Sequence, residues 1–139
     1  MNVAFVYSLD DAESNIKPLR SQEYIQFGIS YISSFLKKNH HATKLVVLSK
    51  IFGSTYKTLI DQCVKDFSPK LFCFTAVHSE YSFIASVANY VKTAYPDIYL
   101  LIGGCHASLN PEEMLQADFD AVCIGEGELP ILELVSKLE

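Results

Sequence analysis

The chain has 139 residues, of which 50 % are hydrophobic and 19 % charged, and its formal net charge is −5. This length and composition fit one globular domain with a core of its own and exclude a disordered chain. Lysines and arginines do not cluster, and no apolar run approaches the roughly 20 residues of a membrane span, so we expect neither nucleic acid nor a membrane as a partner.

The cysteines indicate a reducing environment. None of the four is spaced as C-x-x-C, which disfavours a zinc or iron–sulfur site built from them. Cys73 and Cys123 lie within apolar runs, where cysteine acts as a small hydrophobic residue. The first residues lack the charged, apolar and small-residue pattern of a signal peptide, so we expect none. We therefore expect reduced thiols and a cytoplasmic protein.

Strand-like and helix-like segments alternate along the chain. In order, the first half predicts a strand at 2–8, a polar loop at 9–24, a helix at 25–38, a strand at 43–48 and a helix at 56–67. The second half predicts a strand at 71–75, a helix at 83–95, a strand at 98–102, a short helix at about 111–116, a strand at 121–124 and a helix at 131–138.

Some of these segments have distinctive ends. Asn39 is expected to end the first helix in the left-handed conformation, and Ser68-Pro69 to end the second. Pro111 is expected to open the short helix. The loop over 9–24 is long for a compact domain, which indicates a functional or mobile segment.

Five strands that alternate with helices predict a parallel sheet covered on both faces. Right-handed crossovers favour the strand order 2-1-3-4-5, that is, a flavodoxin-like three-layer α/β/α sandwich. A ligand is then expected outside the carboxyl ends of the strands, in a crevice lined by the loops after strands 1, 3, 4 and 5.

Glycines follow two neighbouring strands at this edge. Gly103 and Gly104 come after the fourth strand, and Gly125 and Gly127 after the fifth. A backbone without Cβ atoms can approach a ligand closely, although tight turns without a ligand also use glycine. Glu126, between the second pair, could instead match the positive end of the last helix.

Two histidines and several small residues are candidates at the same edge. His106 follows the first glycine pair, and its alternative role is that of a solvated loop residue. His78 comes after the third strand and could reach the crevice or simply open a helix, and Ser79 follows it. Thr75 adds a small hydroxyl group at the end of that strand. We assign no chemistry to the other two histidines, His40 and His41.

Other proteins of this predicted fold are excluded by their motifs. A phospho-receiver would need an Asp where Thr75 stands and a Lys near Gly125, although Asp10 and Asp11 could supply its acidic pair. A flavodoxin needs a phosphate loop after the first strand, where residues 9–13 are acidic. The P-loop motif is absent, and the second glycine pair lacks the third glycine of a dinucleotide fingerprint.

Two motifs in this order resemble the N-terminal cobalamin-binding domain of class B radical S-adenosylmethionine enzymes. They are GGCHAS at 103–108 with Pro111, and DAVCIGEGE at 120–128. The helix from Gly28 through His40 resembles the first helix of that family, and residues 69–75 fit its third strand. The resemblance covers nearly the whole chain, so we expect residues 1–139 to form one Rossmann-like cobalamin-binding domain.

The resemblance implies a corrinoid held against the carboxyl edge of the sheet, with its nucleotide tail beside the fourth strand. The residues that it assigns to cofactor contact are Thr75, Ala76, Val77, Gly103, Gly104, His106, Gly125, Glu126 and Gly127. It assigns no catalytic residue and no metal ligand, because the Asp-x-His-x-x-Gly motif that ligates cobalt in the methionine-synthase type of domain is absent here.

The resemblance also implies a longer parent enzyme. The C-x-x-x-C-x-x-C motif of the family's 4Fe-4S cluster is absent from these residues, so the cluster and S-adenosylmethionine would belong to a C-terminal radical barrel domain. The terminal Leu138-Glu139 is either native sequence or a cloning remnant, and we favour the remnant slightly. The parent would be a methyltransferase or an oxidoreductase or cyclase. The alternative is a non-catalytic docking or scaffold module of the same fold that has lost the cofactor.

Overall fold

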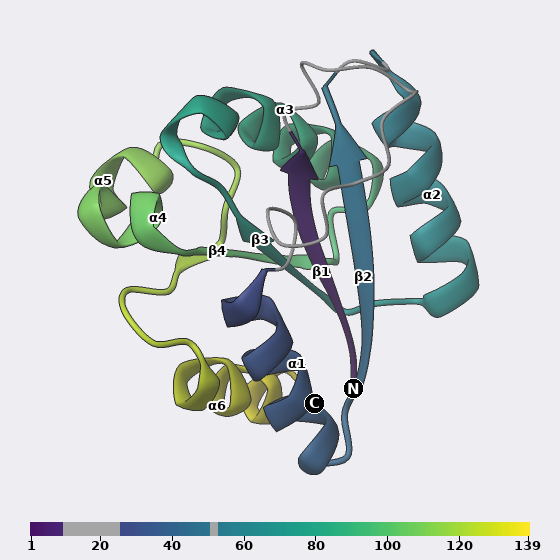
Figure 1. The fold of residues 1–139 in the computed structure, drawn as a ribbon. Coiled ribbons are helices and arrows are strands. Elements are labelled where there is room, and N and C mark those ends of the chain that lie inside the picture. Colours follow the sequence, from purple (N-terminus) through teal and green to yellow (C-terminus); the bar gives the residue numbers. More distant parts are fainter. Residues whose placement is uncertain (10–25, 51–52) are drawn as a thin grey trace.

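The structure, a computed structural model, describes residues 1–9, 26–50 and 53–139 (Figure 1). Its strands are β1 Asn2–Leu9, β2 Ala42–Ser49, β3 Leu71–Thr75, β4 Tyr99–Gly103 and β5 Ala121–Val122. Its helices are α1 Phe27–Lys38, α2 Thr55–Phe67, α3 His78–Ala94, α4 Cys105–Leu109, α5 Pro111–Met114 and α6 Glu128–Leu138.

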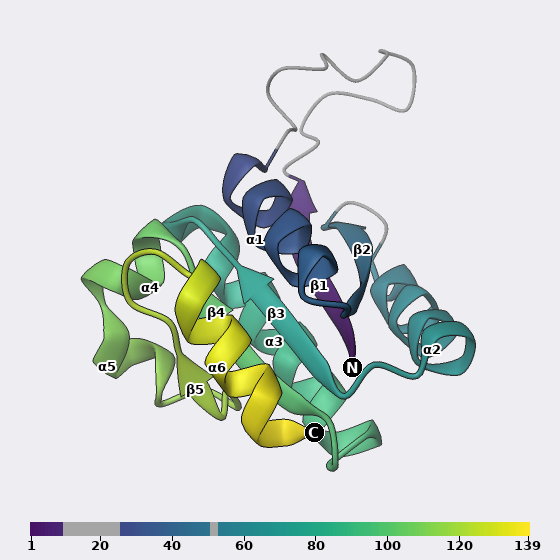
Figure 2. The ribbon, with the colours of Figure 1, turned by 90° about the horizontal axis from the view of Figure 1, so that it is seen from below.

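The five strands form one parallel sheet in the order β2-β1-β3-β4-β5. In this register Val3 pairs with both Thr43 and Leu71, and Thr75 pairs with Gly103. Helices α1 and α6 lie together on one face of the sheet, whereas α2 and α3 lie on the other (Figures 1 and 2). The predicted flavodoxin-like fold and strand order are therefore confirmed.

The strands are apolar at consecutive positions because both faces of the sheet are covered. On β4, Leu100 belongs to the core shared with α2 and α3, whereas its neighbour Leu101 belongs to the core shared with α1 and α6. On β3, Phe72 and Cys73 divide in the same way. These inner strands therefore contribute alternate side chains to two separate hydrophobic cores, whereas the edge strand β2 contributes Val46 and Leu48 to the α2 and α3 core.

Two helices begin earlier than predicted. Helix α3 begins at His78 rather than 83, because its first turn is polar and shows no apolar period. Helix α6 begins at Glu128 rather than 131, and the amide of Ile131 donates to the carbonyl of Gly127. Pro130 fits inside this first turn, where backbone amides have no partner within the helix.

The carboxyl edge between β4 and β5 also differs from the prediction. The segment after Gly104 was expected to be a loop but forms the short helix α4. Helix α5 ends at Met114, and the chain continues as turns in which the amides of Gln116 and Ala117 donate to carbonyls three residues back. Strand β5 has only two residues, so the predicted strand over 121–124 was too long.

The end of α1 was predicted at the right place with the wrong conformation. Asn39 has φ −99° and ψ 26°, and the left-handed residue is His40, with φ 65°. The side chain of Asn39 instead donates to the carbonyl of Phe35. Helix α2 ends at Phe67, as predicted from Ser68-Pro69, and Ser68 itself has the left-handed conformation, with φ 47°. Apart from Leu9 in β1, the predicted loop over 9–24 and the first residue of the predicted helix at 25 lie outside the described residues.

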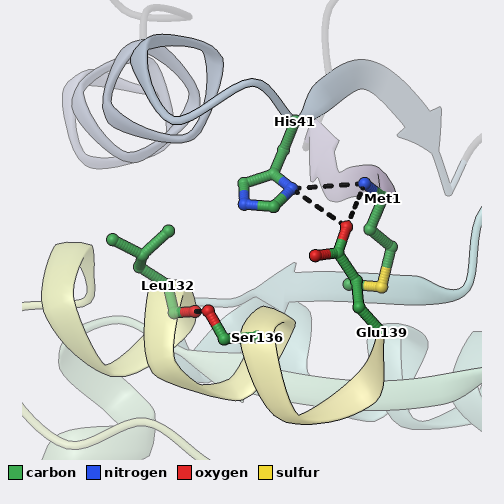
Figure 3. A network of polar contacts seen from close by, with 5 residues as sticks. All are labelled: Met1, His41, Leu132, Ser136 and Glu139. Carbon is green, nitrogen blue, oxygen red and sulfur yellow. Dashed lines mark hydrogen bonds and ion pairs between the residues drawn. The ribbon is translucent and has the colours of Figure 1, made fainter.

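The two ends of the domain meet at the amino edge of the sheet (Figure 3). The Met1 amino group donates to Oε1 of Glu139 at 2.6 Å and lies 3.2 Å from Nδ1 of His41. The hydrogen bond from this amino group lowers the pKa of the Glu139 carboxyl group. None of the helices in the described part of the chain is both long and apolar enough to cross a lipid bilayer.

Candidate functional site

A cleft of about 640 Å³ opens at the carboxyl edge of the sheet, between α1 and α6. Its size lies within the range of about 300–1,000 Å³ that small-molecule sites occupy. All the sheet strands except β2 contribute to it directly or through the loops that follow them. Its lining residues are Phe5, Gln26, Gly28, Ile29, Ile32, 73–77, Leu101, 103–105, Ser108, Leu109, Cys123, 125–128 and Ile131.

The buried floor of the cleft is apolar. It consists of Phe5, Cys73, Leu101, Cys123 and Ile131, all of which belong to the core shared by the sheet with α1 and α6. Burial raises the pKa of the Cys73 thiol strongly and, together with the nearby Glu128 carboxylate, also raises that of Cys123. Both thiols therefore stay neutral, and the floor has no charge.

The first glycine pair is shaped by packing against β3. Gly104 has φ +97°, and a Cβ atom there would stand 2.5 Å from Oγ1 of Thr75. A Cβ atom on Gly103 would lie 3.4 Å from the Cβ atom of Cys123, close to ordinary contact. Gly104 is thus required by its own backbone and by Thr75, independently of any ligand.

The second glycine pair differs from the first. Gly125 has φ +77°, and nothing lies within 4 Å of the position of a Cβ atom there. Its amide donates to Oγ of Ser108 at 3.0 Å, which ties the loop after β5 to α4. A Cβ atom on Gly127 would stand 2.7 Å from Cδ1 of Ile32, so this glycine allows the amino end of α6 to pack against α1.

His106 lies outside the lining of the cleft. Its side chain is only 7 % exposed, and its ring packs against those of His78 and Tyr81, with centroids 5.0 and 5.2 Å away. Nε2 lies 3.5 Å from Oε2 of Glu113, and Nδ1 lies 3.3 Å from Nδ2 of Asn110. The alternative of a solvated loop histidine is therefore wrong: His106 is a buried residue of α4.

The candidate residues fall into two groups. Those that line the cleft are Thr75, Ala76, Val77, Gly103, Gly104, Gly125, Glu126 and Gly127. His106 is directed to the α3 and α5 side, and the exposed His78 begins α3 and packs against it instead of lining the cleft. The carbonyl of Ser79 accepts a hydrogen bond from Lys50, and Ser79 does not line the cleft either.

Sequence reasoning missed the helical walls of the cleft. Ile29 and Ile32 of α1 and Ile131 of α6 read as ordinary core positions from their helical spacing. The available signal was Gly28, which interrupts the apolar side of α1 and adjoins the cleft. Ser108 was predicted only as a member of the GGCHAS motif. Its hydrogen bond with the Gly125 amide could not be predicted from residue spacing.

Comparisons with known proteins agree with this geometry. A sequence profile of the B12 binding domain family matches residues 20–135. Since the match spans most of the chain, the protein belongs to the B12 binding domain family.

Two further similarities concern individual proteins. An uncharacterized methyltransferase of Pyrococcus horikoshii is 29 % identical over 132 residues, which are 94 % of this chain and 28 % of that protein. The chain thus spans less than a third of the length of this curated relative. The crystal structure of a cobalamin-binding protein from Desulfitobacterium hafniense DCB-2 matches with a TM-score of 0.66 at 11 % identity, over 99 % of this chain and 58 % of that one. This second similarity concerns the fold.

Proposed function

We propose that the protein binds cobalamin at the carboxyl edge of its sheet, with the nucleotide tail of the cofactor in the cleft between α1 and α6. The observation on which this proposal depends is the cleft itself, an open space of about 640 Å³ with an apolar floor beneath a rim of glycines. This volume suits the tail and is too small for the whole cofactor. The flat corrin ring would therefore lie over the mouth.

The residues present fit such a ligand. At Gly28 and Gly125 a Cβ atom would meet nothing within 4 Å, so both positions leave space that an ordinary side chain would reduce. The apolar floor suits the base of the tail. At the mouth, the Thr75 hydroxyl is placed to donate to phosphate or amide oxygens, and the exposed Glu126 carboxylate can accept from amide groups of the ring.

The histidine positions indicate that this chain offers no imidazole to cobalt from α3 or α4. His106 is buried outside the cleft, and His78 packs against its ring. No group of three or more His, Cys, Asp or Glu residues in the described ranges is arranged to hold a metal ion. The role that we assign to the described residues is to bind and orient the corrinoid and to keep water from its tail.

In the intact protein we propose that the domain presents the corrinoid to an adjoining radical S-adenosylmethionine domain with a 4Fe-4S cluster. A bound corrinoid would supply a methyl group or an electron to that reaction. The motif resemblance supports this arrangement, as does the length of the Pyrococcus horikoshii methyltransferase, of which this chain matches 28 %. Sequencing the reading frame beyond residue 139 for C-x-x-x-C-x-x-C tests it.

The alternative of a docking module that has lost the cofactor predicts a crevice blocked by bulky side chains after strands 1 and 3. After β3 the crevice is open, since Thr75 and Ala76 are small and both line the cleft. The segment after β1 lies outside the described residues. The open side of the crevice favours cofactor binding.

Equilibrium dialysis of the full chain against hydroxocobalamin tests the proposal. We expect saturable but weak binding, because much of the corrin ring stays exposed to water when no second domain covers it. A shift of the visible spectrum on titration would give an independent measurement. Absence of binding at millimolar cobalamin would contradict the proposal and favour the docking module.

A further inference from the structure

The chemistry of the cleft changes sharply between its floor and its mouth. The floor residues Phe5, Leu101 and Ile131 have no polar side-chain atom, and the thiols of Cys73 and Cys123 are only weak hydrogen-bond donors. Burial holds both thiols in the neutral form by raising the pKa of each. A ligand group in contact with these five residues therefore meets no strong donor or acceptor from their side chains, and the charged lining residue near them is the half-buried Glu128.

The polar side chains that line the cleft are partly or fully exposed, unlike the buried floor residues; they are Gln26, Thr75, Ser108, Glu126 and Glu128. Thr75 ends β3 and lies beside Gly104, and Glu126 is exposed in the loop after β5. Ser108 already accepts a hydrogen bond from the Gly125 amide. Phosphate, sugar and amide groups can find partners here, whereas a base in contact with only the floor residues cannot.

From this gradient we propose that the cleft selects corrinoids by the lower base of the nucleotide tail, favouring an alkylbenzimidazole or a similar apolar aromatic base over a purine. The inference rests on the proposed function and adds the chemical class of the tail. A purine has ring nitrogens and, in adenine, an amino group, and burying these without partners loses their hydrogen bonds to water. An alkylbenzimidazole presents methyl and ring carbon atoms instead, which gain from burial.

The test compares three corrinoids on the full chain by equilibrium dialysis. They are hydroxocobalamin, the corresponding corrinoid with adenine as lower base, and cobinamide, which has no nucleotide tail. We expect cobalamin to bind about 10- to 100-fold more tightly than the adenine form, the range in which an apolar pocket rejects a more polar ligand of similar size. Cobinamide should bind more weakly than cobalamin, because it leaves the cleft empty.

The outcomes separate the inference from the proposed function. Equal affinity for the cobalamin and adenine forms, both above cobinamide, would overturn the base selectivity and leave cobalamin binding intact. Equal affinity for all three would overturn both the selectivity and the placement of the tail in the cleft. If none of the three binds, the proposed function itself fails.

A matched pair of substitutions tests whether the floor is responsible. Cys123→Ser places a hydroxyl group, a strong donor and acceptor, at the floor, whereas Cys63→Ser makes the same change in the core shared with α2 and α3. We expect Cys123→Ser to reduce the preference for cobalamin over the adenine form by about threefold or more, since one buried polar group would gain a partner. Cys63→Ser should leave the preference unchanged. An unchanged preference in folded Cys123→Ser, or an equal change in both variants, would contradict the role of the floor.

Discussion

The two faces of the sheet share the same strands but differ in their role. On the face covered by α2 and α3, aromatic residues pack together: Tyr56 of α2 contacts Phe83 and Tyr90 of α3 edge to face, and Phe74 of β3 contacts Phe119. Between the sheet and helices α1 and α6, the buried side chains apart from Phe5 are aliphatic or carry a thiol, and a cleft remains at the carboxyl edge. The first face has the packing of a core, whereas the second combines a core with a binding site.

A parallel sheet can therefore hold a ligand on one face while the other face contributes a packed core. Here Gly127 allows α6 to approach Ile32 of α1, and both residues line the cleft.

The largest expected effect comes from neighbouring leucines of β4. Leu100 is 0 % exposed in the α2 and α3 core, and Leu100→Ala should lower the free energy of unfolding by about 2–5 kcal/mol. Leu101, 5 % exposed, borders the cleft, so Leu101→Ala adds to an existing space and should cost less. Urea unfolding measures both. Leu101→Ala, but not Leu100→Ala, should also weaken cobalamin binding, and the reverse pattern would contradict the assignment of the faces.

Substitutions of the rim glycines test whether protein packing or space for the ligand requires glycine at the mouth of the cleft. Gly104→Ala should cost about 1–3 kcal/mol of unfolding free energy, because it combines a left-handed backbone with a Cβ atom 2.5 Å from Thr75. A substitution at Gly104 therefore disturbs folding as well as binding. Gly125→Ala is the control, with the left-handed backbone but no neighbour within 4 Å, and it should cost less. Equal losses would mean that the contact with Thr75 is relieved without cost.

Gly28 offers a way to fill the cleft without disturbing the fold. Its backbone is helical, and nothing lies within 4 Å of the position of its Cβ atom. Gly28→Leu should weaken cobalamin binding at least about tenfold while leaving stability unchanged or slightly raised, because leucine favours a helix more than glycine does. Ser34→Leu places the same side chain at an exposed position of α1 and should leave binding unchanged. Unaltered affinity in Gly28→Leu would contradict the proposed site.

The smallest effect concerns the filled face and its pH dependence. Tyr90 donates to Asp61 at 2.6 Å, and this hydrogen bond raises the pKa of Tyr90 to about 12. Because its pKa in the unfolded chain is about 10, the bond stabilises the fold fully below that pH and is lost as the pH rises toward 12. Tyr90→Phe should cost about 0.5–1.5 kcal/mol at neutral pH and flatten the loss of stability above pH 10. Urea midpoints measured across this range check the effect, and an equally steep loss in the variant would contradict it.

Most of the fold could be predicted from the sequence, because the hydrophobic patterns that indicate its strands and helices are local and repeated. Five apolar runs at strand length, separated by amphipathic helices, leave few arrangements other than the observed strand order. The start of α3 escaped prediction because its first turn has Glu80 and other polar residues where an apolar period was expected. Propensity and periodicity describe helix interiors better than helix ends.

Only the loop residues of the candidate site could be predicted from the sequence. Glycines after β4 and β5 indicated the right edge, but the side chain of His106 depends on packing against Tyr81 and His78, which lie about 25 residues away in the chain. The walls from Ile29, Ile32 and Ile131 depend on how far α1 and α6 stand apart. Such spacing between elements is a tertiary property that no local pattern records.

The hydrogen bond between the Gly125 amide and Ser108 makes the two sides of the mouth mechanically dependent on each other. A displacement of the loop around Glu126 would pull on α4, and α4 holds His106 against α3. A ligand that presses on one side should therefore slow local opening on both. Amide hydrogen exchange at Gly125 and at Ser108, whose own amide donates to the Gly104 carbonyl, would then slow together when a corrinoid binds.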